Sequence, residues 1–81
     1  MTINNRTQPF IVESTKAKIA TVVQKIRERR MMLNYTQAYV ASKLGISQNA
    51  YSKIETSLTN FNIDRLYTIA EILHVDVKDL L

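Results

Sequence analysis

The sequence contains no cysteine and no tryptophan, and it has one glycine and one proline in 81 residues. Without cysteine the chain has neither disulfide bonds nor thiolate metal sites, which suits a reducing compartment. No run approaches the roughly 18 apolar residues needed to span a bilayer, and the N-terminus lacks the basic and apolar regions of a secretory signal. We therefore expect a cytoplasmic protein that is stabilised by packing alone.

Catalytic constellations are also missing from the sequence. His74 is the single histidine, and no nucleophile with a base, glycine-rich phosphate loop or pair of carboxylates on one apolar face is present. The length favours a single small domain over an enzyme with an enclosed active site. We expect a binding protein that is not an enzyme and has no metal or other cofactor.

Charge is unevenly distributed along the chain, whose net charge is +4. Residues 1–33 contain seven basic and two acidic side chains, whereas residues 59–81 contain two basic and four acidic ones. A basic front and an acidic rear suggest that one side of the domain faces a polyanion. The alternative is that these charges are simply solvated.

Apolar periodicity predicts an all-α fold, a compact five-helix bundle over residues 15–81. Residues 1–14 are polar and lack a sustained period, so we expect a flexible arm, or alternatively a strand that pairs in a dimer. The five helices are expected over about 15–33, over about 36–43, from 47 onward, over 62–74 and over 76–81. In the fourth helix the expected apolar stripe consists of Ile63, Leu66, Ile69, Ala70 and Leu73.

The one glycine, Gly45, lies between the second and third expected helices. The segment 37–56 reads QAYVASKLGISQNAYSKIET, with a small residue at Ala41 and apolar anchors at Ile46, Tyr51 and Ile54. A helix-turn-helix needs a small residue where its helices approach, a glycine turn and such anchors. This segment resembles the DNA-binding helix-turn-helix of the phage repressor and Cro-like regulators, the XRE family, and the resemblance covers about residues 22–81.

Arg30 falls on the apolar face of the first helix, four residues after Ile26 and three before Leu33, so it needs a carboxylate partner. The resemblance supplies Glu55, because the family commonly joins an arginine near the end of the first helix to a glutamate that ends the recognition helix. We expect a partly buried ion pair between these two residues. Tyr51 is expected in the core, with its hydroxyl reaching the backbone or a phosphate.

If the third helix is the recognition helix, its outward side chains read bases in the major groove. The expected base-contacting residues are Gln48, Asn49, Ser52 and Lys53. The expected phosphate-contacting residues are Thr36, Gln37, Lys43, Thr59 and Asn60, and Arg27 and Arg29 could add charge. The alternative for each is an exposed polar residue without a DNA contact.

These features suggest a sequence-specific DNA-binding transcriptional regulator, most simply a homodimeric repressor that binds double-stranded DNA. The expected dimer interface comprises Ile72, Val75, Val77, Leu80 and Leu81, although these residues could instead close the core of the monomer. Family members often have basic residues after the recognition helix, whereas ETSLTNFN carries no charge beyond Glu55. This departure favours the alternative function, a protein-interaction module or an antitoxin whose main partner is a toxin.

Overall fold

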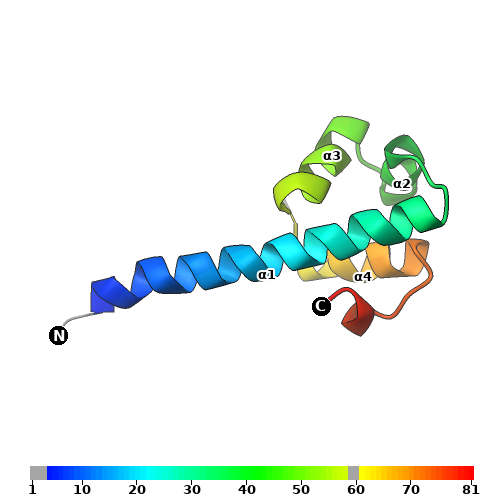
Figure 1. The fold of residues 1–81 in the computed structure, drawn as a ribbon. Coiled ribbons are helices and arrows are strands. Elements are labelled where there is room, and N and C mark those ends of the chain that lie inside the picture. Colours follow the sequence, from blue (N-terminus) through cyan, green and yellow to red (C-terminus); the bar gives the residue numbers. More distant parts are fainter. Residues whose placement is uncertain (1–3, 59–60) are drawn as a thin grey trace.

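The computed structural model describes residues 4–58 and 61–81, with side chains from residue 14 onward. It contains four α-helices, α1 (Asn4–Met32), α2 (Gln37–Leu44), α3 (Gln48–Ser57) and α4 (Ile63–Ile72), followed by one 3₁₀ turn, η1 (Val77–Asp79) (Figure 1). No strand occurs in these two stretches of chain. The all-α prediction is confirmed, but the prediction of five helices in the bundle is wrong. The last segment forms only a three-residue 3₁₀ turn, and Asp76 makes no side-chain capping bond to it.

Helix α1 begins earlier than the sequence suggested, at Asn4 rather than near Thr15, and spans 29 residues. From residue 4 onward the segment expected to be an arm or a strand is therefore helical, while residues 1–3 lie outside the described part. Helical hydrogen bonds are local, so a helix that is fixed by packing can continue into a segment without an apolar period. The N-terminal part of α1 projects from the body formed by the other helices (Figure 1).

The chain turns at the C-terminal end of α1 through a left-handed asparagine, as the sequence predicted. Asn34 adopts a left-handed conformation with φ 61°, which asparagine tolerates better than most residues. The backbone N–H of Tyr35 donates to the carbonyl of Arg30 at 3.1 Å. The chain is thereby turned sharply into α2.

The core lies where α2, α3 and α4 meet the C-terminal half of α1. Helix α3 packs on both α1 and α2, and α4 packs on α2 and η1. The buried cluster comprises Ile26, Val40, Ala41, Tyr51, Ile54, Leu66, Ile69, Ala70, Leu73 and Leu80.

Helix α4 differs from the sequence prediction in its apolar stripe and in the position at which it ends. Ile63 is 63% exposed, so the stripe buried by α4 begins only at Leu66. The helix ends at Ile72, two residues early, and His74 takes a left-handed φ of 59° in the place where a terminating glycine is common.

In the described chain, no helix has both the length and the apolar character needed to cross a membrane.

Candidate nucleic-acid interface

The segment from α2 to α3 is built from two side-chain caps and one glycine turn. Thr36 accepts a hydrogen bond from the N–H of Tyr39 at 3.0 Å, and Ser47 accepts one from Ala50 at 3.1 Å. Between the helices Gly45 has φ 73°, and its N–H donates to the carbonyl of Ser42. Both caps satisfy amides that a helix start leaves free, and glycine adopts the left-handed conformation at low steric cost. These contacts leave only residues 45–47 between the two helices.

The inner face of α3 carries a buried carboxylate. Among the residues whose side chains are described, Glu55 is the one buried charged residue, with 2% of its surface exposed. Arg30 reaches it from α1, with its Nε 2.6 Å from Oε2 and its second guanidinium nitrogen, Nη2, 3.0 Å from Oε1. The ion pair expected between these residues is therefore present, in the two-pronged geometry that favours arginine over lysine.

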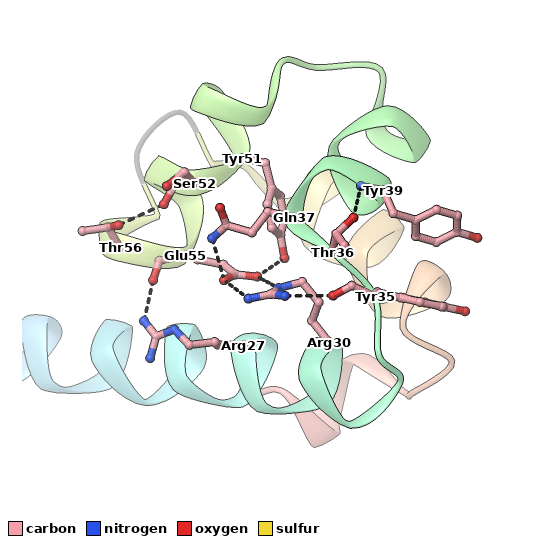
Figure 2. Close-up of polar contacts among 10 residues, drawn as sticks. All are labelled: Arg27, Arg30, Tyr35, Thr36, Gln37, Tyr39, Tyr51, Ser52, Glu55 and Thr56. Atoms are coloured by element: carbon pink, nitrogen blue, oxygen red, sulfur yellow. Dashed lines mark hydrogen bonds and ion pairs between the residues drawn. The ribbon is translucent and has the colours of Figure 1, made fainter.

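Two further donors complete the surroundings of the Glu55 carboxylate (Figure 2). The Tyr51 hydroxyl donates to Oε2, and the Gln37 amide donates to Oε1 at 3.1 Å. The contacts come from α1, α2 and α3 itself, so one side chain joins three helices. No described buried side-chain nitrogen or oxygen atom lacks a hydrogen-bond partner.

The electrostatics follow from this geometry. Burial acts to raise the pKa of Glu55, but hydrogen bonds from Arg30, Tyr51 and Gln37 outweigh it and leave the pKa below its ordinary value. The hydrogen bond to Glu55 raises the pKa of Arg30, against the opposite effect of burial. Burial and the bond to Glu55 both raise the pKa of the Tyr51 hydroxyl. The group is therefore an ionised carboxylate, a cationic guanidinium and a neutral phenol near neutral pH.

Two arginines that could have supplied charge to DNA are used inside the domain. Arg27 donates to the backbone carbonyl of Glu55 at 2.8 Å, near the C-terminal end of α3. Arg29 donates to the carbonyl of Leu73 at 2.8 Å, beyond α4. Cations are stabilising at such helix ends because the last carbonyls lack intrahelical partners.

The outer face of α3 carries the side chains that were expected to contact bases. Gln48, Asn49 and Lys53 are exposed, and Ser52 is partly buried. They lie on the helix that the buried contacts of Tyr51, Ile54 and Glu55 fix from the other side. The structure thus presents two amides and one ammonium group from the outer face of a single helix.

The residues expected to contact phosphate are distributed around α2. Thr36 is exposed and caps α2, while Lys43 lies with its Nζ 5.5 Å from the centre of the Tyr39 ring. Gln37 gives one amide hydrogen to Glu55, which leaves the second hydrogen of the same nitrogen for another acceptor. Thr59 and Asn60 lie outside the described residues.

The residues expected at a dimer interface instead belong mainly to the core of the monomer. Leu80 is 2% exposed and is part of the buried cluster, so it is not available to a partner. Ile72, Val75 and Val77 are partly buried and pack against the same cluster, whereas Leu81 is exposed. Four of the five residues therefore contribute to the core of the monomer, which was the alternative interpretation.

Sequence reasoning missed part of the Glu55 network. The Tyr51 hydroxyl meets this carboxylate rather than the backbone or a phosphate, and the spacing of four residues on one helix is a signal that could have revealed it. The contacts of Gln37 and Arg27 with Glu55 depend on how the helices pack, which no local pattern encodes.

In the part of the chain that the structure describes, no group of histidine and acidic side chains could hold a metal ion.

A search of curated proteins and a search of solved structures each found no match to the chain. A family model described as helix-turn-helix matches residues 26–80, which include α2, the glycine turn and α3. The chain therefore belongs to the Cro/C1-type helix-turn-helix family, also called the XRE family.

Proposed function

We propose that the protein is a homodimeric, sequence-specific repressor that reads the major groove of double-stranded DNA with α3. Membership of the family indicates a DNA-binding transcription regulator. The observation that carries the finer proposal is the two-sided character of α3. Its inner face is fixed by Arg30 and Glu55, while its outer face presents Gln48, Asn49 and Lys53.

The chemistry of this outer face suits base edges in the major groove. The amides of Gln48 and Asn49 can each donate to and accept from adenine, and Lys53 can donate to the N7 and O6 atoms of guanine. The second amide hydrogen of Gln37 and the exposed N-terminus of α2 suit a phosphate oxygen. Lys43 adds a positive charge on the same helix.

We propose a dimer because one copy reads only a short site. Three or four side chains at about 1–3 kcal/mol each read only a few base pairs. Selection among genomic sites needs a preference of about 4–10 kcal/mol over non-specific DNA. Two copies on half-sites about 34–36 Å apart would supply it.

In vitro selection from random duplex DNA tests the proposal. We expect an inverted repeat to be enriched, and we expect the triple variant Gln48→Ala, Asn49→Ala, Lys53→Ala to lose the sequence preference while it stays folded. The matched control is Lys16→Ala, which removes an exposed lysine from α1. Full affinity and preference in a folded triple variant would show that α3 does not read the bases.

One feature favours a second function, that of a protein-interaction module or antitoxin. The run after Glu55 contains no charged residue up to Asp64, so phosphate attraction there is weak. The dependence of DNA affinity on salt separates the two functions. A regulator with several charged phosphate contacts loses affinity steeply as salt rises, whereas an interaction module shows weak DNA binding without sequence preference.

A further inference from the structure

The hydroxyl of Tyr51 lies in the core, where the filling of space does not require it. The side chain is fully buried, and it belongs to the hydrophobic cluster that α3 shares with the other helices. Phenylalanine has the same ring, so packing explains the aromatic group but not its oxygen. A buried hydroxyl carries a desolvation cost unless it is hydrogen-bonded, so the group that it contacts indicates what the oxygen does.

That group is the carboxylate of Glu55, four residues later on α3. An ionised carboxylate has about four sites at which it accepts a hydrogen bond. Oε2 accepts from Arg30 Nε and from the Tyr51 hydroxyl, and Oε1 accepts from Arg30 Nη2 and from Gln37 Nε2. Arg30 and Tyr51 therefore leave Gln37 a single acceptor site on the carboxylate.

The donors differ in how firmly they are held. Burial fixes the Tyr51 ring, and because burial also raises the pKa of the hydroxyl, this group stays protonated and donates. Gln37 is partly exposed and has a flexible side chain at the first position of α2. In Figure 2, Tyr51 and Gln37 both reach the carboxylate from the side away from α1. Without the hydroxyl, Oε2 would offer the Gln37 amide a second acceptor beside Oε1.

We propose that Tyr51 is a positioning residue for DNA binding, which acts through Glu55 to hold the Gln37 amide in the orientation that meets a phosphate. This inference rests on the proposed function, because it needs DNA at the N-terminus of α2. One hydrogen of Gln37 Nε2 goes to Oε1, so a fixed amide directs the second hydrogen one way. A donor that is oriented before binding loses less conformational entropy when the phosphate arrives.

The variant Tyr51→Phe should have a small but measurable effect on DNA affinity. It keeps the buried ring and removes one donor to Glu55. A freed Gln37 amide spreads over about two to three orientations, of which one suits the phosphate, so affinity for one half-site should fall about two- to threefold. The sequence preference should not change, because phosphate contacts carry no sequence information.

A thermodynamic cycle with Gln37→Ala separates positioning from general destabilisation. Affinity for a duplex with one selected half-site is measured for the wild type, both single variants and the double variant. If Tyr51 acts through Gln37, Tyr51→Phe lowers the affinity only where Gln37 is present. An equal loss in both backgrounds would overturn the proposal, since a hydroxyl that only stabilised α3 would act without the amide. Tyr39→Phe is the matched control, because it removes the hydroxyl of an exposed tyrosine on α2 and should leave the affinity unchanged.

A second measurement needs no DNA. Nuclear magnetic resonance of the isotope-labelled protein observes the side-chain amide protons of Gln37 and reports whether each variant is folded. In the wild type, the proton bonded to Glu55 should exchange with solvent more slowly than the amide protons of the exposed Gln48. Tyr51→Phe should remove most of this difference, and Tyr39→Phe should preserve it. The same slow exchange in folded Tyr51→Phe as in the wild type would contradict the positioning role.

Together the two measurements separate this inference from the proposed function. A wild type that selects no DNA sequence, but whose Gln37 amide responds to Tyr51→Phe, would support the positioning of the amide and refute the regulator. A wild type that binds a specific sequence, but whose Gln37 amide does not respond to Tyr51→Phe, would refute the positioning and retain the regulator.

Discussion

Removal of Arg30 tests whether its ion pair with Glu55 holds α3 on the domain. Arg30→Ala deletes two hydrogen bonds to the Glu55 carboxylate and one to the carbonyl of Tyr35. Glu55 remains 2% exposed and retains donors only from Tyr51 and Gln37. Leaving a buried charge without its partner costs about 3–5 kcal/mol. At roughly 0.05–0.15 kcal/mol per residue, the whole domain has only about 4–12 kcal/mol of stability.

The expected result is a variant that has lost a large part of its free energy of unfolding and unfolds at a much lower urea concentration than the wild type. Urea denaturation followed by far-ultraviolet circular dichroism measures the loss of unfolding free energy. The slope of that free energy against urea concentration should be the same in the variant and the wild type. Lys53→Ala is the control, because this exposed side chain should change the free energy of unfolding by less than about 0.5 kcal/mol. A loss below about 1 kcal/mol in Arg30→Ala would refute the reasoning, since it would mean that the carboxylate is effectively solvated.

A double variant separates the free-energy cost of leaving Glu55 unpaired from the net contribution of the ion pair to stability. The double variant Arg30→Met, Glu55→Leu removes both charges and fills their volume, so it should be more stable than Arg30→Ala. It still leaves the buried Tyr51 hydroxyl without its acceptor, which costs about 1–3 kcal/mol. We therefore expect the double variant to lie between Arg30→Ala and the wild type in urea midpoint.

Three further measurements follow from individual contacts. The pKa of Glu55 is lowered on folding, so the ionised carboxylate stabilises the folded state above the ordinary pKa of 4.5, and this stabilisation is lost as pH falls through the lower folded pKa. The difference in urea midpoint between wild type and Arg30→Ala should therefore shrink in acid. A difference that stays constant with pH would contradict this. Gly45→Ala should cost about 1–2 kcal/mol, because the added Cβ meets no atom within 4 Å and only the φ of 73° is strained; a loss above about 3 kcal/mol in urea would reveal a clash instead. Ser47→Ala should cost about 1 kcal/mol through the lost cap of α3, with recovery in Ser47→Asp, whereas no recovery would show that the hydroxyl acts elsewhere.

Local chemistry determined which parts of the structure the sequence could predict. The caps Thr36, Ser47 and Asn62 were identifiable because each binds an amide three residues away. The left-handed conformations of Asn34 and Gly45 were identifiable for the same reason, since they depend on the residue itself.

Features that depend on how elements meet were predicted less well. Ile63 has the spacing of a core residue, yet it lies at the first position of α4, where the buried face has not begun. The extent of α1 was underestimated because residues 4–14 show no apolar period, although a helix needs none to continue. Leu80 was assigned to an interface because a sequence cannot distinguish an apolar residue that closes a core from one that meets a partner.

The Glu55 network connects stability with the surface that we propose for DNA. A carboxylate with bonds to donors from α1, α2 and α3 restricts how these helices can shift relative to one another, because any shift lengthens at least one bond to a buried charge. The same carboxylate orients the Gln37 amide, whose remaining hydrogen is available to a phosphate. An apolar residue at position 55 could fill the space, but it could not fix the direction of that amide. The buried charge therefore costs desolvation and in return determines both the angle of α3 and the orientation of a group at its edge.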